Sequence, residues 1–99
     1  MYAVIFKATT HNLDKEYFNM AKKMRDLAIN EYGCKAFTAV TEGSEEIAIS
    51  YWDSLEDIKK WKQNSEHLIA QELGQRKWYS DYTVEIVEVM SSYEKKDKL

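Results

Sequence analysis

A chain of 99 residues with 44% hydrophobic residues is long enough for one domain, which buries only roughly 60 to 70% of its unfolded surface. Its 14 basic and 17 acidic residues give a net charge of −3, and no basic stripe is interleaved with aromatic residues, which argues against nucleic acid as a partner. The single cysteine excludes an internal disulfide, and no apolar run of about 20 residues is present to span a membrane. We therefore expect a cytoplasmic protein with one domain over residues 1–93 and a charged, flexible tail over residues 94–99.

The first third of the chain predicts a strand followed by a helix. Residues 2–10, with the sequence YAVIFKATT, are apolar on both sides of an alternating pattern, which is typical of a strand covered on both faces. From Leu13 to Tyr32, apolar residues recur at spacings of three and four, which predicts an amphipathic helix. We expect Asn12 to cap this helix and Gly33 to end it, because glycine readily adopts a left-handed conformation.

A hairpin is predicted next. Residues 36–41 and 47–52 have strand patterns, and the polar stretch EGSEE between them contains Gly43, which can adopt the positive φ of a turn. The two strands should therefore pair antiparallel. The carboxylates of Glu45 and Glu46 are interpreted as the solvated tip of this hairpin.

A second helix and a last strand complete the pattern. Asp53 and Glu56 resemble a capping box, so the helix should begin at Ser54. The polar stretch KQNSE at residues 62–66 interrupts the apolar face, which predicts a broken or kinked helix. Residues 82–89 alternate again and predict a fourth strand.

The order β-α-β-β-α-β is that of a ferredoxin-like α+β fold, in which a four-stranded antiparallel sheet carries both helices on one face. Several strands are nevertheless apolar on both sides, and 99 residues leave no spare element to cover the second face. We therefore expect a homodimer in which two sheets pack face to face.

The second half of the chain resembles a known family. The stretches SYWDSLEDIKKWKQNSEHLIAQELG, at residues 50–74, and KWYSDYTVEIVEV, at residues 77–89, combine several features. These are a strand ending in Tyr-Trp, an acidic cap, a helix tryptophan, a Glu-His pair and a late Trp-Tyr pair. The combination resembles the antibiotic biosynthesis monooxygenase family of dimeric α+β barrels, and the element order extends the resemblance over about residues 2–90.

The resemblance implies a cavity between the helices and the sheet that binds a small aromatic compound, such as a quinol or an anthrone. Family members that oxidise such compounds work without metal, flavin or haem, because the deprotonated substrate itself donates an electron to oxygen and the protein supplies a base in an apolar pocket. His67 is then the catalytic base or a hydrogen-bond donor, since the pKa of histidine lies near neutrality. The residues expected to bind the substrate are Trp61, Tyr51, Trp52, Gln71, Trp78 and Tyr82.

The residues by themselves leave structural interpretations open beside these roles. Trp61 lies at helical spacing within an apolar face, where a core position is the simplest interpretation. Trp78 and Tyr82 fit a packed aromatic corner as well as a ligand site. Tyr51 and Trp52 point to opposite faces of one strand, so at most one of them can line a given pocket.

Two further functional hypotheses and two negative expectations follow. The same fold could serve a non-catalytic ligand-binding protein or a structural dimer without a pocket. Haem-degrading relatives carry a ligating histidine where this chain has Gln71, and glutamine is a poor haem ligand, so haem is disfavoured. His11 and His67 are far apart, so no metal site is expected, and Cys34 is interpreted as a small buried apolar group.

Overall fold

The computed structural model describes residues 1–11, 13–71 and 78–97, and the side chains of residues 65–71 lie outside this description. Its strands and helices are β1 (Tyr2–Thr10), α1 (Lys15–Glu31), β2 (Ala36–Glu42), β3 (Glu45–Trp52), α2 (Leu55–Gln71) and β4 (Tyr79–Glu88). This β-α-β-β-α-β order confirms the ferredoxin-like fold. Within the described residues, no helix is both long and apolar enough to cross a membrane.

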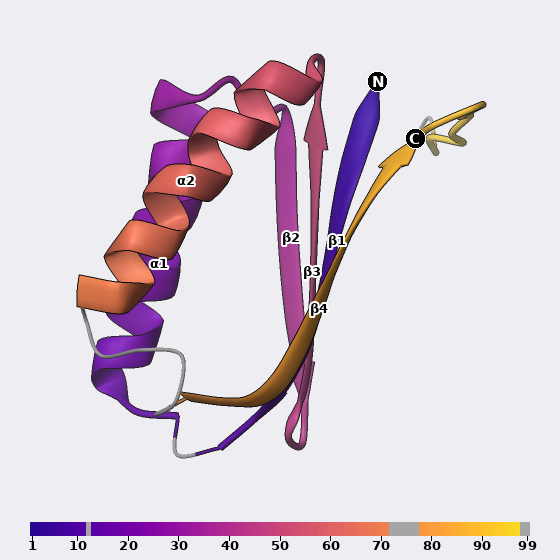
Figure 1. Ribbon diagram of the computed structural model, residues 1–99. Helices are drawn as coiled ribbons and strands as arrows, with labels where there is room; N and C mark the ends of the chain where they lie inside the picture. Colours follow the sequence, from indigo (N-terminus) through magenta and orange to yellow (C-terminus); the bar gives the residue numbers. More distant parts are fainter. Residues whose placement is uncertain (12, 72–77, 98–99) are drawn as a thin grey trace.

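The four strands form one antiparallel sheet in the order β2-β3-β1-β4. Both helices lie on one side of the sheet, and the edge strand β4 curves away from them (Figure 1). Because side chains alternate along a strand, the paired residues Val4 and Ser50 face the helices, whereas the next pair, Ile5 and Ile49, faces away. One face of the sheet is therefore covered by helices and the other is open.

The ends of α1 are set by local hydrogen bonding and by one glycine. Asp14 is the N-cap, and its Oδ1 accepts a hydrogen bond of 2.9 Å from the backbone N–H of Tyr17. The predicted cap, Asn12, lies outside the described residues. Gly33, with a φ of +81°, follows the helix as predicted.

The second helix, α2, differs from its prediction at two points. Ser54 caps it by accepting a backbone hydrogen bond of 3.1 Å through Oγ, whereas the predicted cap, Asp53, forms an ion pair of 3.1 Å with Lys35. The helix also runs unbroken through KQNSE, so the predicted break is wrong. This stretch contains neither glycine nor proline, and Asn64 donates a hydrogen bond of 3.0 Å to the hydroxyl of Tyr32, the C-cap of α1. The polar stretch that predicted a break is therefore accommodated within the helix, and one of its side chains finds a hydrogen-bond partner in the tertiary structure.

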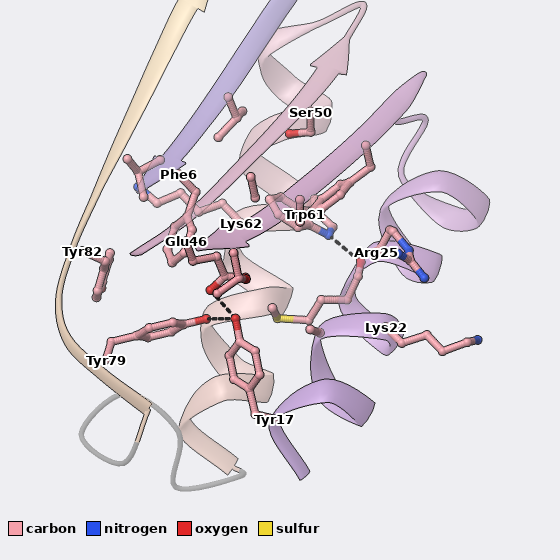
Figure 2. Close-up of a pocket in the computed structure, with 18 of the residues that line it drawn as sticks. Phe6, Tyr17, Lys22, Arg25, Glu46, Ser50, Trp61, Lys62, Tyr79 and Tyr82 are labelled. Carbon is pink, nitrogen blue, oxygen red and sulfur yellow. Dashed lines mark hydrogen bonds between the residues drawn. The ribbon is translucent and has the colours of Figure 1, made fainter. Parts of the chain in front are cut away.

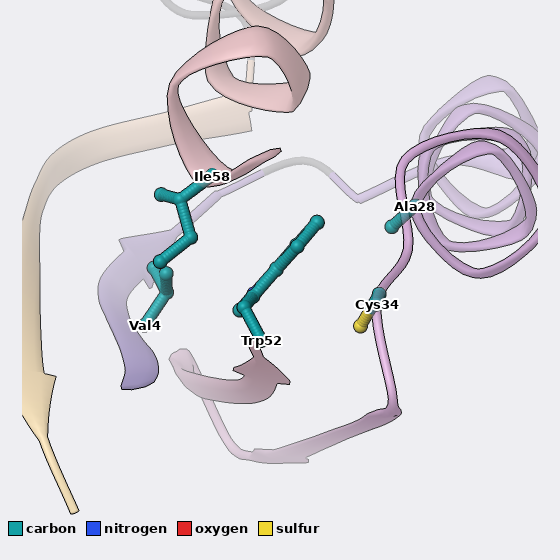
Figure 3. Close-up of a cluster of buried hydrophobic side chains, with 5 residues drawn as sticks. All are labelled: Val4, Ala28, Cys34, Trp52 and Ile58. Atoms are coloured by element: carbon teal, nitrogen blue, oxygen red, sulfur yellow. The ribbon is translucent and has the colours of Figure 1, made fainter. Parts of the chain in front are cut away.

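Two clusters of buried side chains lie between the helices and the sheet. The first consists of Val4, Ala28, Cys34, Trp52 and Ile58 (Figure 3). The second consists of Ala8, Tyr17, Met20, Trp78 and Tyr79. Trp52 is fully buried, and its Nε1 donates a hydrogen bond of 2.8 Å to Oγ of Ser50. Cys34 is a buried member of the core, as the sequence predicts, and burial raises the pKa of its thiol.

The substitution Trp52→Ala tests how much the first cluster contributes to folding. Because Trp52 is fully buried, its removal should lower the free energy of unfolding by about 3–5 kcal/mol. Leu55→Ala is the control, since the Leu55 side chain is 52% exposed and should change stability by less than about 0.5 kcal/mol. Urea denaturation followed by circular dichroism measures both values, and equal losses in the two variants would contradict this description of the core.

Candidate functional site

A cavity of about 330 Å³ lies between the helices and the sheet, at the low end of the volumes that small-molecule sites occupy (Figure 2). Its space arises from small side chains. Ala39 of β2 and Ala48 of β3 pair across the two strands and place only methyl groups toward the helices. The two core clusters contribute side chains to the cavity wall, so the cavity occupies a gap that the packing around it leaves open.

Aromatic rings form much of the cavity wall and hold one another in place. Phe6 stacks on Tyr82 with ring centroids 5.7 Å apart and meets Tyr79 edge to face at 5.4 Å. Trp61, on α2, packs against Phe37 at 6.1 Å, and its Nε1 donates a hydrogen bond of 3.2 Å to the backbone oxygen of Met24. These contacts give the cavity rigid, flat walls suited to a flat ligand.

A polar cluster closes the end of the cavity near the start of α1. The hydroxyl of Tyr17 donates a short hydrogen bond to Oε2 of Glu46, and the hydroxyl of Tyr79 donates to that of Tyr17 at 3.5 Å (Figure 2). Glu46 is only 8% exposed. A carboxyl group therefore lies inside a mainly apolar cavity, where it is held by a chain of two phenol hydroxyls.

The prediction that Glu46 is a solvated hairpin residue is wrong, although the neighbouring Glu45 is exposed. The strand β3 begins at Glu45, so Glu46 already belongs to the alternating pattern. It shares a face with Ser50 and Trp52, which point toward the helices. Counting back from Trp52 in steps of two is the sequence signal that would have identified it.

Burial controls the ionisation of this cluster. It raises the pKa of Glu46, and the hydrogen bond from Tyr17 partly opposes that shift. Burial, together with the bond to Glu46, also raises the pKa of Tyr17, and burial raises the pKa of Tyr79 to about 12. Both tyrosines are therefore neutral hydrogen-bond donors at physiological pH, while Glu46 takes up a proton more readily than an exposed glutamate.

The charges around the cavity are separated in space. Lys22 and Arg25 of α1 and Lys62 of α2 line it from the exposed surfaces of the helices. Lys22 forms an ion pair of 2.9 Å with Asp26, one turn further along α1. The basic groups thus lie at the solvent side, and the carboxyl group lies against the sheet. Within the described residues, no group of three or more side chains is suited to hold a metal ion.

The structure distributes the residues predicted from the sequence over three environments. Trp61 and Tyr82 lie in the cavity wall. Trp52 and Trp78 are fully buried in the two core clusters and do not line the cavity, and Nε1 of Trp78 has no hydrogen-bond partner among the described residues. Tyr51 lies on the open face of the sheet.

The backbones of His67 and Gln71 belong to α2, but their side chains lie outside the described residues. Sequence reasoning did not single out Phe6, Tyr17 or Glu46 as part of a site. These residues are separated widely along the chain, so only the fold shows that they surround one cavity.

Comparison with known proteins identifies one sequence relative and several structural ones. The uncharacterized protein YqjZ of Bacillus subtilis (strain 168) is 36% identical over 89 residues, which cover 89% of this chain and 78% of YqjZ. No family model matches the chain.

Two solved structures illustrate the structural likeness. A mutant of SnoaB, a cofactor-independent oxygenase from Streptomyces nogalater, superimposes with a TM-score of 0.75 at 11% identity, covering 95% of this chain and 97% of SnoaB. A protein described as an antibiotic biosynthesis monooxygenase superimposes with a TM-score of 0.68 at 14% identity. The match covers 92% of this chain and 100% of the chain of that protein. At these identities the likeness shows a shared fold.

The buried carboxyl group of Glu46 should leave a mark on the pH dependence of stability. Because its pKa is higher in the folded than in the unfolded state, native stability should fall as the pH rises from about 4.3 through the folded-state pKa. Glu46→Gln should lack this decline, whereas Glu45→Gln should follow the native curve. Urea denaturation at a series of pH values measures the difference. A native and a Glu46→Gln curve that stay parallel would contradict the expectation.

Proposed function

We propose that this chain, which belongs to the protein family of YqjZ from Bacillus subtilis and has the fold of the antibiotic biosynthesis monooxygenases, is a cofactor-independent monooxygenase of a small aromatic compound. The proposed substrate is quinol-like or anthrone-like. The observation that carries the proposal is the apolar cavity with flat aromatic walls and a polar cluster at one end. SnoaB, which shares the fold, is described as a cofactor-independent oxygenase, and this supports the same reaction class.

The reaction needs three contributions from the protein. An anthrone loses a proton from its ring methylene group, and the resulting anion transfers an electron to O₂. Recombination of the two radicals and loss of water convert the methylene group to a carbonyl, so that one oxygen atom enters the product and the other leaves as water. The protein must accept the first proton, stabilise the anion by hydrogen bonds and hold the ring away from solvent.

Each contribution has a candidate residue. Trp61 and Tyr82 hold the flat ring between the walls, and the hydroxyl of Tyr79 donates a hydrogen bond to the anion. His67, on α2, is the proton acceptor that the sequence favours. The apolar lining excludes water from the anion, which strengthens every hydrogen bond made to it.

Oxygen consumption with an anthrone, in the presence of a metal chelator, tests this proposal. The protein should increase the rate over the spontaneous reaction, and Ala48→Leu, which fills the cavity, should reduce the increase at least about tenfold, or about 1.4 kcal/mol. Ala36→Leu, the same change at an exposed position of β2, is the control. His67→Ala should also lower the rate at least about tenfold if His67 accepts the proton.

A rate equal to the spontaneous background would exclude this substrate class. If the anthrone then still quenched tryptophan fluorescence in a saturable way, the result would favour a ligand-binding protein without turnover. Circular dichroism of each variant separates a loss of activity from a loss of fold.

We also propose that the protein is a homodimer through the open face of the sheet. Val40, Ile47 and Tyr51 are exposed on this face, although all three are large hydrophobic residues. Met90 and Tyr93, which follow β4, are 93% and 96% exposed. A second sheet packed on this face would bury the apolar surface that the helices leave uncovered.

Substitution of a charge on the open face tests the dimer. Ile47→Lys should convert a native dimer into a monomer, because an unpaired ammonium group in an apolar interface is costly. Ile29→Lys is the control, since Ile29 is exposed on α1, away from the open face. Sedimentation equilibrium measures the mass, and a native protein that sediments as a monomer at high concentration would refute the proposal.

A further inference from the structure

The carboxyl group of Glu46 has one oxygen engaged and one open. Its Oε2 accepts the hydrogen bond from Tyr17, and its Oε1 has no hydrogen-bond partner among the described residues. Glu46 lines the cavity. Oε1 is absent from the fully enclosed polar atoms without a partner, so part of its surface is accessible. A ligand in the cavity can therefore reach Oε1.

The surroundings of Glu46 favour proton uptake. In the described part of the chain, the titratable groups that interact with it are the hydroxyls of Tyr17, on α1, and Tyr79, on β4, while Lys22, Arg25 and Lys62 line the same cavity at its solvent side. Among the described residues, no cation forms an ion pair with Glu46. A buried carboxylate that has no ion-pair partner is stabilised when a ligand donates a proton to it.

We propose that Glu46 is the proton acceptor of the cavity and that the ligand is a hydroxyaromatic compound whose hydroxyl group donates to Oε1. The proposal rests on the proposed function in so far as the cavity is the ligand site. It assigns the base to Glu46 of the sheet in place of His67 of α2, so His67→Ala in the oxygen-consumption experiment distinguishes the two assignments. It also narrows the ligand to compounds with an acidic hydroxyl group on a flat ring.

The proton transfer is balanced within the complex. The O–H bond of the ligand breaks, its proton forms a bond to Oε1, and the electron pair stays on the ligand oxygen. The total charge of the cavity is unchanged, but it moves from a compact carboxylate to an anion that is delocalised over the ring, which costs less in an apolar environment. Tyr79 then stabilises the ligand oxygen, because its bond of 3.5 Å to Tyr17 is long enough to be exchanged for a better one.

The test measures binding of 4-nitro-1-naphthol, a two-ring phenol, and of its methyl ether, which has no acidic proton. Tryptophan fluorescence quenching gives both dissociation constants from about one pH unit below the pKa of the naphthol to about two units above the higher of two pKa values, that of the naphthol and that of folded Glu46 from the stability curve. The proteins are the native chain, Glu46→Gln and the matched control Glu45→Gln, which alters the exposed neighbour. The pKa values of Tyr17 and Tyr79 are raised, the latter to about 12, so these two hydroxyls do not titrate in this range. Lys22, Arg25 and Lys62 line the cavity in all three proteins, so their effects cancel in the comparison.

Above both pKa values the naphthol is an anion and Glu46 is a carboxylate, so the pair must take up one proton when the complex forms. For the native chain and Glu45→Gln, the dissociation constant of the naphthol should therefore rise about tenfold per pH unit. For Glu46→Gln it should stay constant, and the methyl ether should bind with a constant affinity in every protein. At the lowest pH, the native chain should prefer the naphthol to the ether at least about tenfold, and Glu46→Gln should lose this preference.

Each other outcome has a defined meaning. A native dissociation constant that is flat with pH overturns the proposal without reference to any variant, and so does a native-like slope in Glu46→Gln. If the native chain binds neither probe, the cavity is not the ligand site and the proposed oxygenase fails with it. If the expected slopes appear but anthrone oxidation does not, the oxygenase proposal fails while Glu46 stands as the acceptor.

Discussion

The hydrogen bond from Tyr17 to Glu46 joins the first turn of α1 to the beginning of β3 across the interior of the protein. A carboxyl group placed there without a polar partner would be strongly destabilising. The hydroxyl of Tyr17 supplies that partner, and Tyr79 extends the chain of hydroxyls to β4. Three elements that are distant in the sequence are thereby held together, and the linked hydroxyl and carboxyl groups lie together at one end of the cavity (Figure 2).

The cavity persists because its surroundings are rigid. Methyl groups on neighbouring strands leave the space, and interlocked aromatic rings keep the walls apart. Trp61 belongs both to the core packing and to the cavity wall. Its ring centroid lies 5.4 Å from that of the core residue Trp52, and its side chain lines the cavity. Of these two neighbouring tryptophans, Trp52 at the end of β3 belongs to the core alone, whereas Trp61 on α2 both packs against the core and lines the cavity.

The edge strand β4 forms one wall of the cavity and is itself partly exposed to solvent. Tyr82, Val84 and Ile86 line the cavity, yet they remain exposed because β4 curves away from the helices (Figure 1). The opposite face of the sheet also exposes large hydrophobic residues. In a chain of 99 residues, two helices cannot cover both faces and an edge strand as well. The uncovered apolar surface is thus a direct consequence of the small size of the domain.

The sequence by itself determined the number, order and type of the elements, because periods of two and of three to four residues are local properties of the chain. It also determined the turn at Gly33, since glycine adopts a positive φ without strain. The continuity of α2 depends on tertiary structure, because the side chain of Asn64 donates its hydrogen bond to the hydroxyl of Tyr32, the C-cap of α1. The cavity and its polar end were decided at the same level. In the sequence, Tyr17 belongs to the apolar face of the first helix and Glu46 looks like a turn residue. Only the tertiary structure brings the phenol to the carboxylate and buries both side chains.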